Sequence, residues 1–273
     1  MNNFICPICK NMLDLNNRTL KCRNNHCFDL AKEGYVNLLP INAKKSKDPG
    51  DNSKMMTARR AFLETNHYMP LAEKLAEVVK NISGNKQMTV LDTGCGEGYY
   101  SGHIKSHNTS VNMLGLDISK LAVKYASKRY KAVHFCVASA YDLPVEDEAI
   151  DILVRVFAPS SISEIQRVVK DGGSLITVTP GERHLYQLRE LIYKDVRKHF
   201  EEPALVEGFK LGNRIKLKYS LSLDDLDTVL NLLDMTPFGW KIGDGEKNIL
   251  MKMSHWEIDC DFNIEIYTKT SVL

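Results

Sequence analysis

Apolar runs alternate with amphipathic stretches along most of the chain between residues 88 and 199. Short continuous apolar runs are typical of buried strands, whereas apolar positions three and four residues apart are typical of helices packed on a core. Strands are predicted at 88–93, 112–118, 133–138, 149–157 and 173–179, and helices at 98–107, 119–129, 161–169 and 184–199. Strands that alternate with helices predict an α/β fold with a parallel, doubly wound sheet.

The segments on either side of this region have different patterns. Helical spacing of apolar residues at 55–63 and 71–79 precedes the first strand. Residues 214–223 and 260–267 alternate as strands do, and 224–233 has a helical apolar stripe. Alternation of this kind is typical of strands with one exposed face. We therefore expect a terminal antiparallel hairpin added to the edge of the parallel sheet.

A glycine-rich segment follows the first strand. Gly94, Gly96 and Gly98 let the backbone turn tightly where a side chain would collide with a ligand, and Asp117 ends the next strand. Nucleosides bind at this edge of open α/β sheets, where an acid can accept hydrogen bonds from ribose hydroxyls. The spacing is G-x-G-x-G after Asp92, rather than the dinucleotide-binding G-x-G-x-x-G. A carboxylate there repels a pyrophosphate but suits a cationic amino-acid cofactor, which predicts S-adenosylmethionine.

Length and composition narrow the class of protein. The 273 residues suffice for one large domain and a small one. The sequence has neither the roughly 18-residue apolar stretch of a membrane helix nor a signal-peptide pattern, so we expect a cytoplasmic protein without a membrane partner. Net charge is only +2, yet residues 1–60 hold eleven Lys and Arg against five Asp and Glu. The basic linker expected at 41–60 fits either an RNA-binding surface or a solvated connection.

Four of the seven cysteines lie close together near the start of the chain. Cys6 and Cys9 form a C-x2-C pair, and Cys22 is followed four residues later by His26. Zinc takes four such ligands in a tetrahedron. Cys27 competes with His26 for the fourth position. Because protein ligands would fill every position, we expect a structural zinc ion, on which the folding of this short polar segment depends.

Further runs accompany these two signals. They are 31–40 (Ala-Lys-Glu-Gly-Tyr-Val-Asn-Leu-Leu-Pro), 48–51, 55–63, 92–100, 235–238 and 261–264. With them the chain resembles, nearly end to end, the bacterial 23S rRNA (guanine-N1)-methyltransferases of the RlmA type. The resemblance implies a zinc-ribbon-like RNA-binding domain at 1–40 and a class I S-adenosylmethionine-dependent methyltransferase domain at 61–273. It also implies methyl transfer to N1 of a guanosine in a 23S rRNA hairpin that lines the peptide exit tunnel.

The resemblance also implies roles for single residues. The positions that match the zinc ligands are Cys6, Cys9, Cys22 and His26, which favours His26 over Cys27. The positions that match the cofactor pocket are Tyr68, Gly96, Glu97, Asp117 and His184. The glycine loop itself adds Gly94 and Gly98 to the expected cofactor-binding residues. Ser139 and Ala140 follow the third strand, where such folds contact the adenine.

The run at 155–160 follows the fourth strand, where methyltransferases of this fold that act on nitrogen hold the target base. Phe157 could stack on guanine and Arg155 could stabilise charge at O6; the alternatives are a core phenylalanine and an ion-paired arginine. Because the N1 proton is weakly acidic, a base or a group that stabilises the O6 enolate is expected. We predict that no single side chain is an obligatory base. N1 lies on the pairing edge, so the guanosine must be unpaired or flipped out.

Two other functions remain open from the sequence. One is an RNA-binding or ribosome-assembly module with an inactive methyltransferase fold, which the intact glycine loop and Asp117 disfavour. The other is a methyltransferase of small molecules or proteins, which the zinc segment disfavours. The sequence leaves open which guanosine is modified, whether free rRNA or a ribosomal intermediate is the substrate, and whether the chain forms a homodimer.

Overall fold

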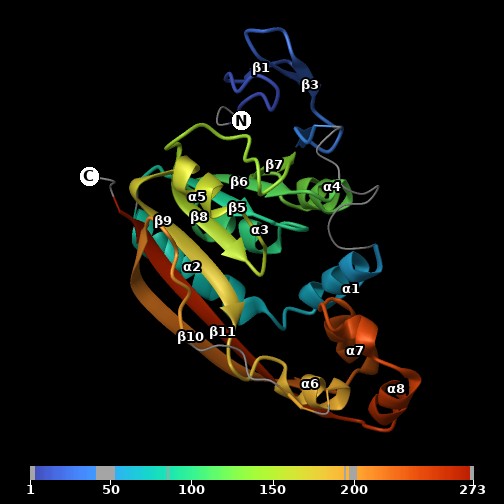
Figure 1. The fold of residues 1–273 in the computed structure, drawn as a ribbon. Coiled ribbons are helices and arrows are strands. Elements are labelled where there is room, and N and C mark those ends of the chain that lie inside the picture. Colours follow the sequence, from blue (N-terminus) through green and yellow to red (C-terminus); the bar gives the residue numbers. More distant parts are fainter. Residues whose placement is uncertain (1–3, 41–52, 85, 194, 197–201, 271–273) are drawn as a thin grey trace.

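The computed structural model describes residues 4–40, 53–84, 86–193, 195–196 and 202–270. Its centre is an eight-stranded sheet with the strand order β10-β11-β9-β8-β5-β6-β7-β4 (Figure 1). Six of these strands run parallel, and five of the six form the middle of the sheet: β5 (Thr89–Thr93), β6 (Asn112–Asp117), β7 (His134–Val137), β8 (Ile150–Val156) and β9 (Val169–Pro180). The predicted parallel α/β sheet is therefore confirmed.

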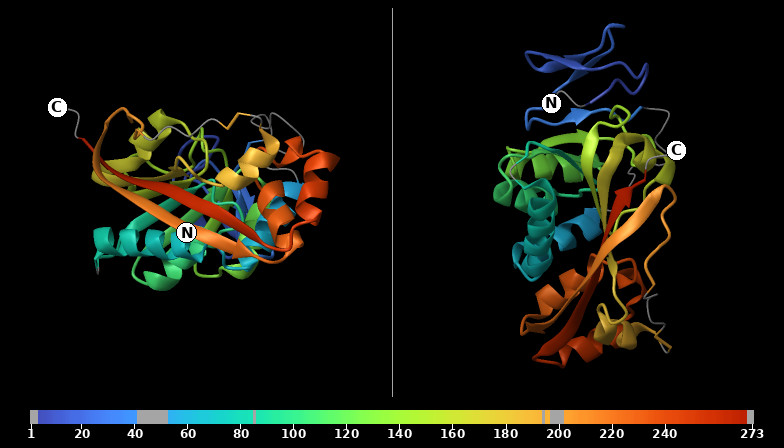
Figure 2. Two further views of the ribbon diagram at one scale, coloured as in Figure 1. Left: turned by 90° about the horizontal axis from the view of Figure 1, so that it is seen from below. Right: turned by 90° about the vertical axis from the view of Figure 1, so that its left-hand side faces the viewer.

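A long hairpin extends the sheet beyond β9. β11 (Trp256–Lys269) pairs antiparallel with β9 on one side and with β10 (Phe209–Leu223) on the other. Both strands run past the predicted bounds and curve along one side of the molecule (Figure 2). The terminal antiparallel hairpin is confirmed.

Each face of the sheet is covered by a different set of elements. One face packs against α2 (Met69–Ser83), α3 (Tyr99–His107) and α4 (Lys120–Arg129). On this side Leu75 and Ile104 belong to one core with Val90 and Phe135. The other face packs against α5 (Ile162–Val168) and the front segment of the chain.

The front segment forms a small three-stranded sheet of β1 (Asp14–Asn16), β2 (Thr19–Lys21) and β3 (Cys27–Asp29). The next strand, β4 (Val36–Asn37), joins the edge of the large sheet parallel to β7. Leu20, in β2, is fully buried in the core that contains strand residues of the large sheet. The segment therefore has no separate core and packs against the larger domain.

Two elements differ from the predicted bounds. α1 (Ser53–Glu64) begins inside the expected 41–60 linker, because Met56, Ala58 and Phe62 are buried when this helix packs. The remainder of that linker lies outside the described residues. α6 (Tyr186–Ile192) is shorter than the predicted helix at 184–199, since Tyr193 is already extended (φ −114°, ψ 128°). Part of the predicted remainder, 194 and 197–199, lies outside the described residues.

A small helical unit connects β10 to β11. It consists of α7 (Leu226–Asp234), the 3-10 turn η2 (Gly239–Lys241) and α8 (Asp244–Met251). The helical apolar stripe at 224–233 predicted α7, whereas η2 and α8 were not predicted from the sequence. α7 packs against α1, so that a helix that precedes β5 meets the unit between β10 and β11 next to the carboxyl edge of the sheet (Figure 1). None of the described helices is both long enough and apolar enough to cross a membrane.

Candidate active site and metal centre

The glycine loop between β5 and α3 folds against the end of β6. Gly94, Gly96 and Gly98 all have positive φ, at 72°, 54° and 76°. The backbone N–H of Gly94 donates to the carbonyl of Leu116 at 2.8 Å, which ties the loop to the neighbouring strand. A Cβ on Gly96 would meet nothing within 4 Å, whereas a Cβ on Gly98 would lie 2.8 Å from the Phe135 ring. Gly98 is therefore required for packing beneath the loop, and it does not line the cavity described below.

Asp117 stands at the carboxyl end of β6 and is positioned by the backbone around it. Its Oδ2 accepts a hydrogen bond from the N–H of Gly96 (3.0 Å) and its Oδ1 from the N–H of Ser119 (2.8 Å). A carboxylate oxygen can accept more than one hydrogen bond, so both oxygens keep capacity for a ligand. The predicted acid is thus held rigidly beside the glycine loop.

Two further carboxylates at this end of the site are perturbed by burial. Asp92 is 1% exposed, and burial raises its pKa to about 7 although Ser101 donates to it. Burial also raises the pKa of Glu97 to about 7, although the positive charge of Arg60 acts to lower it. Burial disfavours the charged form of a carboxylate, and a cationic ligand would restore it. This end of the site therefore favours a ligand with positive charge.

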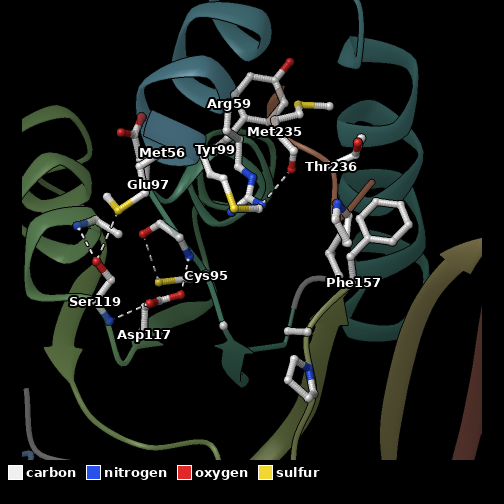
Figure 3. Close-up of a pocket in the computed structure, with 18 of the residues that line it drawn as sticks. Met56, Arg59, Cys95, Glu97, Tyr99, Asp117, Ser119, Phe157, Met235 and Thr236 are labelled. Atoms are coloured by element: carbon white, nitrogen blue, oxygen red, sulfur yellow. Dashed lines mark hydrogen bonds between the residues drawn. The ribbon is translucent and has the colours of Figure 1, made fainter. Parts of the chain in front are cut away.

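These groups line one cavity of about 880 Å³, which opens between the sheet edge, α1 and the helical unit near the C-terminus (Figure 3). The predicted site residues that line it are Tyr68, Gly94, Gly96, Glu97, Asp117, Ser139, Ala140, Phe157 and His184. In Figure 3 Asp117, Ser119 and Glu97 occupy one side, whereas Phe157 and Thr236 occupy the opposite side. The cavity therefore has an acidic end and an aromatic end.

Tyr68 and His184 belong to a group of aromatic rings centred on Phe262. The Phe262 ring lies 5.2 Å from the Tyr68 ring and 4.7 Å from the His184 ring, measured between centroids. The N–H of Asp261 donates to Nδ1 of His184 at 3.4 Å, which leaves the ring proton on Nε2. The Tyr68 hydroxyl and Oε1 of Glu97 are buried and have no hydrogen-bond partner among the described residues.

Unsatisfied polar atoms are rare in protein interiors. Here two of them line a cavity next to a glycine whose Cβ would enter open space. At this end Asp117 can accept hydrogen bonds from hydroxyl groups, and the carboxylates of Asp92 and Glu97 can pair with cationic groups. These residues fit the ribose, the ammonium and the sulfonium groups of S-adenosylmethionine.

Phe157 and Arg155, the two candidates for the target base, have different environments. Phe157 is 45% exposed and lines the cavity. Its backbone has φ +52°, a conformation that residues other than glycine rarely adopt. Its ring stacks on that of His184 at 6.0 Å. Strained residues of this kind concentrate at functional sites.

Arg155 does not line the cavity. Its Nη1 donates to Oγ of Ser160 at 3.1 Å, and burial lowers its pKa while Tyr267 and Glu265 oppose that effect. Tyr267 lies in the core on the opposite face of the sheet. Because successive strand residues point to opposite faces, Arg155 points away from the side that Val156 lines. The expectation that Arg155 reaches O6 of a base is therefore not met.

Several cavity residues were not singled out by sequence reasoning. α1 contributes Met56 and Arg59, whose Nη2 donates to the carbonyl of Met235 at 3.3 Å. Ser119 donates to the sulfur of Met56 at 3.3 Å, so α1 contacts the edge of the cavity (Figure 3). Tyr141, 62% exposed, also lines the cavity. The runs at 55–63 and 235–238 were signals of resemblance, but no local pattern indicated that they meet.

The four predicted metal ligands come together in the front segment. The ligand atoms of Cys6, Cys9, Cys22 and His26 all lie within 4.8 Å of one another. Nδ1 of His26 is 3.4 Å from the sulfur atoms of both Cys6 and Cys22, and the sulfur atoms of Cys9 and Cys22 are 3.6 Å apart. Cys27 is exposed, and its thiol faces the carbonyl of Asn25. The cluster thus contains His26 and not Cys27.

These separations fit a tetrahedral zinc ion. Zinc–sulfur bonds of about 2.3 Å place two ligand sulfurs about 3.8 Å apart, close to the observed spacing. Asn11 assists, because its N–H groups hydrogen-bond to the sulfur of Cys9 and lower the pKa of that thiol to about 6. Zinc binds thiolates, so a thiol that ionises readily favours the metal. With four protein ligands the ion is structural.

Comparison with known proteins agrees with both sites. Residues 4–47 match the family model described as the N-terminal zinc ribbon of RlmA, and residues 84–233 match a methyltransferase domain. A 23S rRNA (guanine(748)-N(1))-methyltransferase of Streptomyces fradiae is 35% identical over 86% of this chain and 85% of its own. YxjB of Bacillus subtilis (strain 168), whose name assigns it the same type of reaction, is 31% identical over 97% of both chains.

Solved structures add the fold alone. A methyltransferase from Bacillus halodurans C-125 has a TM-score of 0.52 at 15% sequence identity and covers 73% of this chain and 100% of its own. This likeness supports the methyltransferase fold of the large domain. The zinc-ribbon match and the relatives from Streptomyces fradiae and Bacillus subtilis show that the chain belongs to the family of the 23S rRNA (guanine-N1)-methyltransferases.

Proposed function

We propose that this protein transfers a methyl group from S-adenosylmethionine to N1 of a guanosine in 23S rRNA. The observation that carries the proposal is one continuous cavity whose acidic end contains Asp117 and Glu97 and whose aromatic end exposes Phe157. Its volume of about 880 Å³ lies near the upper limit of about 1,000 Å³ for ligand pockets, which leaves room for a cofactor and a base together.

At the acidic end we assign binding roles to the residues that line it. Asp117 would accept hydrogen bonds from ribose hydroxyls, as acids at this strand end do. Glu97 and the Tyr68 hydroxyl would pair with polar groups of the amino-acid moiety, which would satisfy their unpartnered atoms. Ser139 and Ala140 would border the adenine. The cofactor supplies an electrophilic methyl group on a sulfonium.

At the aromatic end we assign Phe157 to stacking on the guanine. Stacking of a base on an aromatic side chain contributes about 1–3 kcal/mol. The reaction forms a bond between N1 and the methyl carbon and breaks the bond from that carbon to sulfur, while the N1 proton leaves. His184 stacks on Phe157, so it would help to hold the base in line. Holding two reactants in line accounts for much of the rate of such a displacement.

The position of Arg155 agrees with the hypothesis that no single side chain is an obligatory base. The described residues that line the aromatic end include no carboxylate: the acids of the cavity are Asp92, Glu97 and Asp117. We therefore infer that the N1 proton passes to water and that catalysis rests on positioning. An Ala variant of Phe157 or His184 that lost all turnover with intact RNA and cofactor binding would contradict this inference.

The RNA must present an unpaired guanosine, because N1 is hidden in a base pair. We infer that the acceptor is a hairpin of 23S rRNA lining the peptide exit tunnel, that its shape supplies specificity, and that the zinc-binding segment contacts it. An enzyme with this substrate would act in the cytoplasm. A homodimer stays a prediction.

Methyl transfer to unmodified 23S rRNA tests the proposal directly. Labelled S-adenosylmethionine is incubated with the rRNA, and the modified nucleoside is identified after digestion. N1-methylguanosine in one hairpin is the expected product. The control is Asp117→Ala, which should not bind the cofactor and should not transfer the label. Cofactor binding by the wild-type protein without transfer to rRNA or to ribosomal particles would favour an RNA-binding module with an inactive methyltransferase fold.

A further inference from the structure

α4 has a concentration of positive charge that the proposed reaction does not use. Its ten residues include Lys120, Lys124, Lys128 and Arg129 and no carboxylate. The three lysines are four residues apart, so they follow one stripe along the helix. Lys120, Lys128 and Arg129 are exposed. Lys124 is half-buried, and its Nζ lies 3.8 Å from Oε1 of Glu33 in the front segment.

A second cavity, of about 430 Å³, lies at the C-terminal end of this stripe. It is lined by Arg60, Glu64, Glu97, Tyr125, Lys128 and Arg129. Oε1 of Glu64 accepts from Nε of Arg60 at 3.1 Å and from Nη1 of Arg129 at 3.4 Å. One carboxylate therefore orients two guanidinium groups, and each has five N–H donors, more than this contact uses.

An aromatic ring completes the second cavity. The guanidinium carbon of Arg60 lies 4.9 Å from the centre of the Tyr125 ring, which fixes the arginine further. Glu97 lines both this cavity and the larger one, so the two are neighbours. Arginine pairs of this kind match the geometry of phosphate oxygens.

The stripe also leads toward the expected RNA-binding segment. Figure 1 shows α4 between the three-stranded front segment and α1, on one side of the molecule. Lys131, just after α4, donates to the carbonyl of Glu33 at 3.2 Å, so the two parts are in contact. Lys120 and Lys128 are eight residues apart, a rise of about 12 Å along the helix, which is about twice the separation of successive phosphates in an RNA strand.

We propose that α4 and the second cavity bind the sugar–phosphate backbone of the substrate RNA, with phosphates along Lys120 and Lys128 and one phosphate between Arg60 and Arg129. This inference rests on the proposed function, because it names the surface by which the same substrate is held. Such contacts neutralise phosphates and release counterions, so they give affinity that depends on salt and not on sequence.

The test compares two double variants with the same loss of charge. Lys120→Gln/Lys128→Gln removes two exposed lysines from α4. The matched control, Lys80→Gln/Lys86→Gln, removes two exposed lysines at the end of α2 and just beyond it. Dissociation constants for an unmodified 23S rRNA hairpin are measured on the zinc-loaded full chain over a range of salt, together with KM for RNA and the dissociation constant for S-adenosylhomocysteine.

We expect the α4 variant to bind RNA roughly tenfold more weakly at low salt, and the slope of log affinity against log salt to flatten by about 1.5 for two lost phosphate contacts. KM for RNA should rise, and the cofactor analogue should bind as before. The control should match the wild type in all three measurements. Arg60→Gln should flatten the slope by a further unit or so if its cavity holds a phosphate.

The result that overturns this inference is an equal salt slope for the α4 variant and its control while the wild-type protein methylates the hairpin. Failure of the wild-type protein to methylate any form of 23S rRNA would instead refute the proposed function. A loss of affinity that salt does not affect would show a contact other than phosphate, and would also overturn the proposal.

Discussion

Gly98→Ala should mainly lower stability and Gly96→Ala should mainly weaken cofactor binding, although the two glycines are in one loop. At Gly98 the new Cβ would lie 2.8 Å from the ring of Phe135 and 3.0 Å from Cβ of Ala126, at φ +76°. The left-handed backbone costs about 1–2 kcal/mol for a residue with a side chain. Overpacking a filled core adds about 1–3 kcal/mol. We expect a loss of about 3 kcal/mol in the free energy of unfolding.

At Gly96 the added methyl group meets no protein atom within 4 Å, at φ +54°. Only the backbone term of about 1–2 kcal/mol then applies to stability. Because Gly96 lines the cavity, however, the methyl group would occupy space that we assign to the cofactor. Cofactor affinity should therefore fall by at least about tenfold, which corresponds to about 1.4 kcal/mol.

Thermal unfolding and calorimetry separate the two effects. For a chain of this size a loss of about 3 kcal/mol lowers Tm by roughly 6–12 °C, so Gly98→Ala should melt clearly below Gly96→Ala. S-adenosylhomocysteine binding, measured well below either Tm, should be near normal for Gly98→Ala and weak for Gly96→Ala. Equal Tm values would refute the packing argument at Gly98. Normal binding by Gly96→Ala would refute the position of the cofactor.

Three further predictions concern the metal, the buried acid and the aromatic end. His26→Ala should lose zinc and the fold of the front segment, whereas Cys27→Ser should keep zinc; metal content that is lost from both variants would contradict the ligand set. Burial raises the pKa of Asp92 to about 7, above its unfolded value of about 3.9. Its contribution to the stability of the ligand-free protein is therefore complete below about pH 4 and lost as pH rises through about 7. Urea titrations of Asp92→Asn should show a weaker fall over that range; an unchanged fall would assign it to other groups. Phe157→Ala should lower kcat/KM for RNA roughly 5- to 150-fold at constant cofactor affinity, and Phe157→Tyr should keep most of it; equal losses would exclude stacking.

The features that the sequence predicted correctly depend on residues close together in the chain. The strand and helix periods between 88 and 180 depend on neighbours a few residues apart. The structure keeps their bounds within about one residue, except that β9 begins at Val169 and not at 173. The glycine loop with Asp117, and the spacing of Cys6, Cys9, Cys22 and His26, are equally local. The glycine loop and Asp117 belong to one strand–helix–strand unit, and the four metal ligands come from two short motifs in one small segment, so spacing predicts their chemistry.

The position of α1 beside the cavity could not be predicted from local spacing. Residues 53–60 looked like part of a basic linker, yet Met56 and Arg59 line the cavity because α1 packs on α7, which lies more than 160 residues later. The pairing of the short strand β4 with β7 is another contact of this kind. Burial against a partner distant in sequence decides both, and no local pattern carries that information.

The amino-acid sequence by itself determined the α/β alternation, the cofactor edge of the sheet and the composition of the metal cluster. Only the tertiary structure decided which side chains share the cavity. It placed Arg155 on the far face of β8 and Phe157 inside the site, and it showed that Gly98 is required by the ring of Phe135 and not by a ligand. The reason is physical: spacing along the chain sets which groups are neighbours in one element, whereas packing between elements sets which way each group points and what it meets.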